Sequence, residues 1–210
     1  MERVLYDYFR SSASYRVRIA LNLKGLPYDL QEVHLVKDGG QQHAADYLAL
    51  NPQGRVPALA EGSDVLTQSL AILEYLEEQY PAPALLPQDP VLRAKVRAAA
   101  HTIAMDIHPL NNLSVLQYLQ QTLSVDDEQK KAWYAHWIQI GFRALESQLQ
   151  PTAGPYCFGK HLTFADVCLI PQMYNARRFK VDLHDCPTLL RIDEQCTQLD
   201  AFAQADPDNA

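Results

Sequence analysis

The chain has 210 residues, of which 48% are hydrophobic and 20% are charged, so it can bury the core of one large domain or two small ones. We expect no membrane span, because no run of about 18 apolar residues occurs, and no signal peptide, because the chain begins in a strand-like pattern. The formal net charge of −7 disfavours nucleic acid as a partner, and an anionic substrate would need a local group of arginines.

The first 50 residues alternate between strand and helix patterns. Ser11 and Ser12 lie where the first helix begins, and Gly25 is placed to end it as a left-handed cap. Hydroxyls at a helix start cap free N–H groups, so these serines either only cap the helix or also take part in chemistry. The expected elements are a strand at 4–9, a helix to about residue 24, a strand at 28–35, a polar loop at 37–42 and a helix at 44–50.

The next 30 residues predict a hairpin, with strands at 56–59 and 65–67, followed by a helix from Gln68 and Ser69. Pro57 has no N–H to donate and therefore suggests an edge strand. If the Val56–Pro57 bond is cis, the Val56 N–H and C=O point outward and can pair with an extended peptide. Unpaired N–H groups at the helix start suit a carboxylate. An ordinary hairpin followed by a capped helix remains the alternative.

The proline content marks the domain boundary. Four prolines fall within residues 81–90, which indicates a stiff linker. We therefore expect an α/β domain with one mixed sheet at 1–80, a linker at 81–90 and an all-helical domain at 91–210.

The second half reads as a helical bundle. Asp89 and Pro90 begin a helix that runs to about Leu123, and Pro109 must kink or split it. The other expected helices are 126–149, a helix to about 179 that opens with the capping-box variant Thr163–Asp166, and 187–202. Residues 204–210 are expected to be disordered. The core candidates of the 126–149 helix are Trp133, Trp137, Ile140, Phe142 and Leu145.

The four cysteines lie in the last third of the chain and form no C-x-x-C pair: Cys157, Cys168, Cys186 and Cys196. This spacing argues against a disulfide framework, a zinc site or other metal centre, and a dithiol redox centre. It favours a reducing cytoplasm.

Several blocks in one order give the chain a family resemblance. The segment SSASYRVRIAL at 11–21 resembles the zeta-class glutathione transferase signature SSCSWRVRIAL. Further matches lie at 37–42, 85–90, 109–116 and 178–183, together with the NPxxxVPxL and QSxAIxEYL patterns between residues 51 and 76. The resemblance spans nearly the whole chain. It implies a thioredoxin-like glutathione-binding domain, a helical second domain, a homodimer and glutathione as cofactor. The family contains maleylacetoacetate isomerase, and the maleylpyruvate isomerases are similar.

One departure from the family limits the mechanism. Ala13 replaces the family's cysteine, and Tyr15 replaces its tryptophan. The reactive sulfur must then be glutathione's own. A thiolate can add to a cis double bond, allow rotation and leave again. Ser11, with Ser12 as the runner-up, can donate a hydrogen bond to that sulfur and lower its pKa together with the helix N-terminus.

The resemblance also assigns the binding residues. The cysteinyl backbone of glutathione is expected at Val56, its γ-glutamyl carboxylate at Gln68 and Ser69, and its glycyl end at Gln42. From the helical side, or from a partner subunit, the expected contacts are His108, Asn111 and Asn112; from the sequence alone, His108 reads as a packed histidine.

Arginine suits the two carboxylates of a dicarboxylate substrate, because its planar guanidinium binds a carboxylate in a bidentate way. We select Arg10 and Arg178; the order Arg177–Arg178 does not decide between those two, and the family match selects Arg178. We expect a maleylacetoacetate isomerase. Open alternatives are a maleylpyruvate isomerase, a conjugating or dehalogenating transferase, and a non-catalytic glutathione-binding module. A glutaredoxin-like oxidoreductase is disfavoured, because no cysteine begins the first helix.

Overall fold

A computed structural model describes residues 3–209, and the chain divides into two compact units. The first unit is Met1–Ala84 together with Leu199–Ala210, and the second is Leu85–Gln198. The division falls inside the proline-rich segment. It differs from the expected 91–210 domain at the C-terminal end, because the last residues pack with the first unit.

The first unit is built on a four-stranded sheet of order β2-β1-β3-β4. β1 (Arg3–Asp7) pairs in parallel with β2 (Asp29–Glu32) and antiparallel with β3 (Ala58–Glu61), which pairs antiparallel with β4 (Asp64–Thr67). The mixed sheet is therefore confirmed. β1 is shorter than the expected 4–9, because Tyr8 and Phe9 already belong to the turn that leads into the first helix.

The prediction that Pro57 marks an edge strand is wrong. β3 lies between β1 and β4, so it is an interior strand. Pro57 stands one residue before the first paired residue, Ala58, and its missing N–H therefore removes no bond from either ladder.

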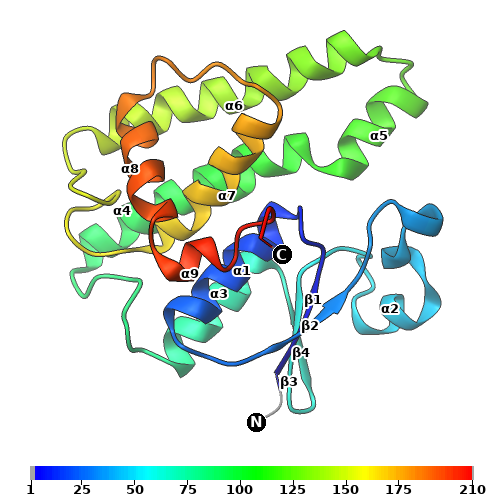
Figure 1. Ribbon diagram of the computed structural model, residues 1–210, viewed down its shortest axis with the longest axis horizontal. Helices are drawn as coiled ribbons and strands as arrows, with labels where there is room; N and C mark the ends of the chain where they lie inside the picture. Colours follow the sequence, from blue (N-terminus) through cyan, green and yellow to red (C-terminus); the bar gives the residue numbers. More distant parts are fainter. Residues whose placement is uncertain (1–2, 210) are drawn as a thin grey trace. The chain divides into compact units, whose positions relative to one another are not determined.

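Helices cover the sheet on both sides. α1 (Ser12–Leu23) and α3 (Ser69–Gln79) lie on one face, and α2 (Ala45–Leu50) lies on the other (Figure 1). The short turns η1 (Lys37–Gly39) and η2 (Gln41–His43) precede α2. The core between sheet and helices consists of side chains with no solvent exposure, among them Leu5, Ile19, Leu59, Ile72 and Leu76. Gly25 follows α1 with φ of 64°, as expected for a left-handed cap.

The C-terminal segment is ordered, in contrast to the prediction for 204–210. α9 (Asp200–Ala203) packs against α1, where Phe202 is fully buried and Asn22 Nδ2 donates to the Ala201 carbonyl at 3.0 Å (Figure 1). Ala205 is also fully buried. Apolar contact with α1 therefore orders a short, polar-looking tail; Ala210 lies outside the described residues.

The second unit is all-helical. α4 (Pro90–His101) begins at the Asp89 cap, whose carboxylate accepts the Leu92 N–H at 2.7 Å. Pro109 divides the expected long helix, because a π-helical turn and a 3-10 turn precede α5. The following elements are η3 (Thr102–Ile107), η4 (His108–Asn111), α5 (Leu113–Gln121), α6 (Asp127–Leu149), α7 (Phe164–Arg178) and α8 (Pro187–Thr197).

The buried face of α6 is only partly as predicted. Phe142 and Leu145 are fully buried, Trp133 and Trp137 are half-buried, and Ile140 is 49% exposed. The capping box at Thr163 and Asp166 is confirmed. The last predicted helix stops at Thr197, before the chain crosses back to the first unit's α9 segment.

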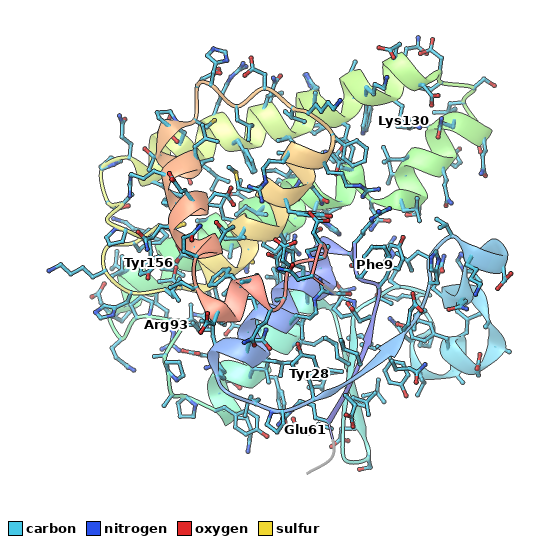
Figure 2. The ribbon with its side chains drawn as sticks, viewed as in Figure 1. Phe9, Tyr28, Glu61, Arg93, Lys130 and Tyr156 are labelled. Carbon is cyan, nitrogen blue, oxygen red and sulfur yellow. The ribbon has the colours of Figure 1, made fainter. Side chains whose placement is uncertain are left out.

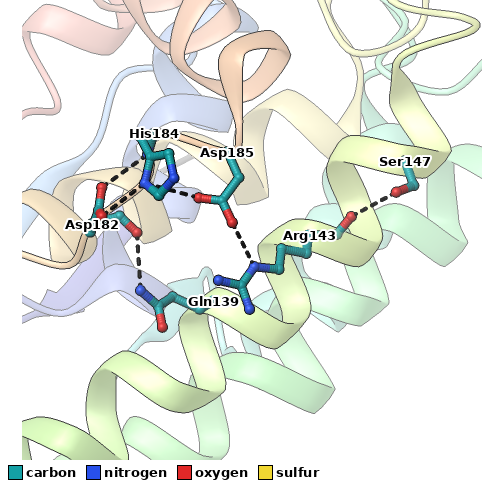
Figure 3. A network of polar contacts seen from close by, with 6 residues as sticks. All are labelled: Gln139, Arg143, Ser147, Asp182, His184 and Asp185. Carbon is teal, nitrogen blue, oxygen red and sulfur yellow. Dashed lines mark hydrogen bonds and ion pairs between the residues drawn. The ribbon is translucent and has the colours of Figure 1, made fainter.

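Polar contacts join the α7–α8 connection to α6 (Figure 3). Arg143 Nε donates to Asp185 at 2.8 Å, and Gln139 Nε2 donates to the Asp182 carbonyl at 3.2 Å. His184 Nδ1 lies 2.8 Å from Asp182 Oδ2 and 3.1 Å from Asp185 Oδ1. The connection that follows Arg178 is therefore held at several points. Within residues 3–209, no helix has the length and apolar character that a bilayer crossing requires.

Candidate active site

The first part of the site is the turn between β1 and α1. Ser11 N–H donates to the Tyr8 carbonyl at 2.7 Å, and Ser11 Oγ accepts the Ser14 N–H at 3.2 Å as the N-cap of α1. Capping uses a lone pair of the hydroxyl and leaves its proton available for donation. Ser11 is half-buried, whereas Ser12 is only 4% exposed. The capping alternative is thus real for Ser11, and it is compatible with a donor role.

No cysteine of the chain is placed to act as a nucleophile. All four cysteines are buried, and all belong to the second unit. Burial raises the pKa of Cys157 well above its ordinary value and that of Cys186 to about 11, so both remain thiols near neutral pH. Ala13 is the second residue of α1. Any reactive thiolate at this helix start must come from a bound molecule.

The second part is the segment before β3. The Val56–Pro57 bond is cis. Tyr47 Oη and Asn51 Nδ2 both donate to the Arg55 carbonyl, at 2.6 and 2.7 Å, so the chain that enters Val56 is fixed. Val56 is half-buried, and its own N–H and C=O make no hydrogen bond to residues 3–209. It therefore presents one free donor and one free acceptor to a ligand backbone.

The third part is the start of α3. Gln68 precedes the helix with φ of 68°, a left-handed conformation that is unfavourable for a residue other than glycine, and its side chain caps no N–H. Instead, Gln68 Nε2 donates to Gln53 Oε1 at 2.7 Å. Ser69 is buried, and its Oγ accepts a hydrogen bond from Arg16 NH1 at 3.2 Å. A buried guanidinium thus adds positive charge beneath a helix N-terminus.

Gln42 lies in a tight polar environment. It is 7% exposed, and its Nε2 donates to the Leu35 carbonyl at 3.3 Å. Its Oε1 has no hydrogen-bond partner among the described residues, although it is buried. Gly40 makes room for this side chain, since a Cβ there would lie 2.5 Å from Gln42 Nε2. A buried acceptor without a partner is unfavourable unless a ligand supplies the donor.

In the second unit, the turn at His108–Asn112 is tied to α6. Asn111 is buried and its Nδ2 donates to the Tyr134 carbonyl at 3.1 Å, while Trp133 Nε1 donates to the Leu110 carbonyl at 2.8 Å. Asn111 Oδ1 has no partner among residues 3–209. Asn112 caps α5 through its Oδ1, which leaves its amide donor; His108 is half-buried.

The two selected arginines are both exposed. Arg178 lies at the end of α7 with its guanidinium 5.2 Å from the Phe179 ring, which stacks on Tyr134 at 3.8 Å. Arg10 lies over the Phe9 ring at 4.9 Å. Neither arginine forms an ion pair with any residue of 3–209. The turn thus carries one free guanidinium in the first unit, and α7 carries one in the second.

Sequence reasoning missed two buried arginines in α1, Arg16 and Arg18, each 1% exposed. They stand among the apolar residues of the helix, and that position is a signal: a guanidinium is seldom fully buried unless it has specific acceptors. Within residues 3–209, no three His, Cys, Asp or Glu side chains are grouped so as to hold a metal ion.

Comparison with known proteins identifies the family of the chain. The family model for the glutathione S-transferase N-terminal domain matches residues 5–84, and the fold and site define the chain as a glutathione transferase. A probable maleylacetoacetate isomerase of Vibrio cholerae is 54% identical over 209 residues, which cover 100% of this chain and 97% of that protein. The chain belongs to the zeta-class glutathione transferases, the family of the maleylacetoacetate isomerases.

Two solved structures of the same family are similar to this chain along nearly its whole length. The holo structure of a zeta-class bacterial maleylpyruvate isomerase superposes with a TM-score of 0.96 at 48% identity, covering 99% of this chain and 98% of that one. A maleylacetoacetate isomerase from Anaeromyxobacter dehalogenans 2CP-1, with dicarboxyethyl glutathione and citrate in its active site, gives a TM-score of 0.87 at 40% identity and covers 100% and 92%. The predicted glutathione transferase fold is confirmed.

Proposed function

We propose that this chain is a glutathione-dependent cis–trans isomerase that converts maleylacetoacetate to fumarylacetoacetate in the breakdown of phenylalanine and tyrosine. Full-length identity of 54% to a probable maleylacetoacetate isomerase is the observation that carries the proposal. The burial of every cysteine agrees with it, because the reaction then depends on the sulfur of a bound tripeptide.

The proposed chemistry is reversible addition. The glutathione thiolate adds to one carbon of the cis double bond, the resulting single bond rotates, and expulsion of the same thiolate restores a trans double bond. The sulfur is neither oxidised nor consumed. Ser11 donates its hydroxyl proton to the thiolate, and the N-terminus of α1 adds a favourable field; both lower the thiol pKa. Ser12, buried in the first turn, is the second candidate for this role.

The binding roles follow from the free polar groups. Val56 pairs with the cysteinyl backbone, because its N–H and C=O are both unused by residues 3–209. Gln68 and Ser69 receive the γ-glutamyl carboxylate at the start of α3. Gln42 Oε1 accepts the N–H of the glycyl end, which would satisfy its buried oxygen.

Three residues of the second unit are further proposed contacts of glutathione. Asn111 retains a buried acceptor, Asn112 retains its amide donor, and His108 adds an imidazole. Arg10 and Arg178 bind the two carboxylates of the substrate, since each carries an exposed guanidinium with no ion pair among the described residues.

The ligand in the Anaeromyxobacter dehalogenans structure supports this division of roles. Dicarboxyethyl glutathione is a glutathione thioether that carries two carboxylates, which is the kind of species that thiolate addition to a dicarboxylic alkene produces. A site of this family thus accommodates an adduct of the proposed type.

Maleylpyruvate is the second candidate substrate, because the maleylpyruvate isomerase structure superposes with a TM-score of 0.96. The two substrates differ at the end remote from the double bond. Leu113 is half-buried at the first position of α5, and an apolar residue there favours the longer maleylacetoacetate. Conjugation, dehalogenation and simple glutathione binding remain as lesser alternatives.

An absorbance assay separates these functions. With maleylacetoacetate and catalytic glutathione, we expect substrate absorbance to fall while total glutathione stays constant over many turnovers. Stoichiometric loss of glutathione would instead indicate conjugation, and binding without turnover of either substrate would indicate a binding module. A ratio of kcat/KM that favours maleylpyruvate would exchange the first and second candidates.

The protein is further proposed to act in the cytoplasm as a homodimer. Cysteines that are buried as thiols agree with a reducing compartment. Light scattering at micromolar concentration should give twice the 23.7 kDa chain mass; a monomer that isomerises at full rate would exclude the dimer as a requirement.

A further inference from the structure

Arg18 lies in the middle of α1 and contacts three separate segments of the first unit. Its NH1 donates to both oxygens of Asp7, at 2.7 and 2.8 Å, at the end of β1. NH2 donates to the Phe9 carbonyl at 2.9 Å, and Nε donates to the Ala205 carbonyl at 3.0 Å. Every guanidinium nitrogen is therefore used by a different acceptor.

The Phe9 carbonyl belongs to the turn that carries the proposed catalytic groups. Arg10 and Ser11 follow Phe9 directly, and the turn is closed by the hydrogen bond from Ser11 N–H to the Tyr8 carbonyl. Figure 2 shows Phe9 just beyond β1, where the chain bends into α1. A donor fixed to Phe9 from inside the unit thus limits where the Ser11 hydroxyl can lie.

The Ala205 carbonyl comes from the opposite end of the chain, 187 residues away in sequence. Ala205 and Phe202 are both fully buried, and α9 packs on α1, so this acceptor is held in place by apolar contact. The C-terminal segment therefore accepts a hydrogen bond from the same guanidinium that also donates to β1 and to the turn at residues 8–11, called the Ser11 turn below.

We propose that Arg18 is a positioning residue that couples the C-terminal segment Leu199–Asn209 to the Ser11 turn, and so sets the ionisation of bound glutathione. This inference rests on the proposed function of Ser11 as the donor to the thiolate. The planar fork is essential to it, because a lysine keeps the charge but cannot reach three diverging acceptors at once. When one of the hydrogen bonds of Arg18 is lost, the Ser11 turn relaxes and the Ser11 hydroxyl moves away from the glutathione sulfur.

Arg3 provides a matched control. It is a buried arginine of β1 that pairs with Glu61, and it also donates to a backbone carbonyl, that of Pro27 at 2.8 Å. Glu61 lies at the opposite end of the sheet from Phe9 (Figure 2). Arg3→Lys and Arg18→Lys therefore remove comparable buried contacts, but only Arg18→Lys removes one beside Ser11.

The experiment measures the thiol pKa of bound glutathione from thiolate ultraviolet absorbance against pH, and the glutathione Kd from calorimetry. We expect Arg18→Lys to raise the bound thiol pKa by about one unit and the Kd by roughly tenfold, as loss of a charge-assisted contact predicts. Arg3→Lys should leave the bound thiol pKa unchanged and the glutathione Kd within about twofold, although its Tm also falls. Equal thiol pKa values in the two variants would overturn the proposal.

A pair of shortened chains tests the C-terminal arm without altering Arg18, and decides the question if Arg18→Lys does not fold. A chain ending at Gln204 lacks the Ala205 carbonyl, whereas a chain ending at Asp206 keeps it. Only the shorter chain should show the raised thiol pKa; the same value in both would contradict the coupling. If the unaltered protein binds no glutathione, the proposed function and this inference both fail. If bound glutathione has the same thiol pKa in all variants as in the unaltered protein, only this inference fails.

Discussion

Arg177 and Asp193 form an ion pair between α7 and α8, while the next residue, Arg178, is exposed and pairs with no carboxylate of residues 3–209. Two adjacent arginines thus have different environments. Arg177 joins two helices of the second unit, and Arg178 is available to a dianion at the end of α7. The structure supplies this physical distinction, which the linear order of the two residues does not contain.

Arg178→Ala should therefore raise KM for the dicarboxylate substrate by at least tenfold, because a guanidinium–carboxylate contact contributes about 1.5–3 kcal/mol. The glutathione Kd should stay within about twofold. Steady-state kinetics with glutathione in excess, and then with the dicarboxylate in excess, separate the two effects.

Arg177→Ala is the matched control for that measurement. It should leave KM unchanged and lower stability by roughly 1 kcal/mol, since the pair is partly exposed. A larger KM effect for Arg177→Ala than for Arg178→Ala would reverse the assignment.

Ser11→Ala should reduce turnover by about 10- to 100-fold, which corresponds to loss of one hydrogen bond to a charged group. The pH profile of kcat/KM should shift to higher pH, because the bound thiol loses a hydrogen-bond donor that lowers its pKa. Ser12→Ala should have a much smaller effect. Small, similar losses in both variants would mean that neither hydroxyl activates the sulfur.

Ser11 also caps α1, so its removal should lower stability by about 1 kcal/mol independently of chemistry. Asp126→Ala is a suitable comparison, since Asp126 caps α6 at an exposed position of the second unit. It should lower Tm to a similar extent while turnover stays unchanged. The comparison separates loss of a cap from loss of a catalytic donor.

Local signals account for most of what could be predicted from the sequence. Gly25, the Asp89–Pro90 pair and the Thr163–Asp166 box each fix a helix end through groups within a few residues of one another. Such interactions depend on spacing along the chain, and spacing is what a sequence displays.

The errors concern partners that are distant in sequence. Pro57 suggested an edge because its neighbours in the sheet, β1 and β4, cannot be read from its own segment. The tail after Gln204 looked disordered because its ordering depends on Arg18 and the apolar face of α1. Ile140 fits the helical apolar period but is 49% exposed, since no element of its unit covers that side of α6 within residues 3–209.

Glu61 predicts an acid-dependent part of the stability. Burial alone would raise the pKa of its carboxyl, but hydrogen bonds from Tyr80, Tyr75 and Arg3 outweigh burial and hold the pKa below the ordinary value of 4.5. A carboxyl with a lowered folded pKa contributes stability above its unfolded pKa and loses that contribution as pH falls through the folded one. The loss should therefore begin below about pH 4.5.

Glu61→Gln should reduce the free energy of unfolding at pH 7 by about 3 kcal/mol, as removal of one partner of a buried ion pair does. The difference from the unaltered protein should shrink as the pH is lowered toward 3 in urea titrations. Asp64→Asn is the control, because Asp64 lies opposite Glu61 in the register of β3 and β4 but its side chain is exposed. A pH-independent difference for Glu61→Gln would show that the carboxyl stabilises the fold by shape alone.

Gly141 permits close packing between α6 and the π-helical turn that precedes His108. A Cβ at this position would overlap the side chain of Ile107, which is 1% exposed and has little room to rotate. Overpacking costs about 1–3 kcal/mol, whereas alanine gains about 1 kcal/mol of helix propensity over glycine. We expect Gly141→Ala to lower Tm and to weaken glutathione binding several-fold, because Ile107 directly precedes the His108–Asn112 turn. Ala144→Leu, at an exposed position of α6, should change neither, and an unchanged Kd for Gly141→Ala would exclude that turn as a glutathione contact.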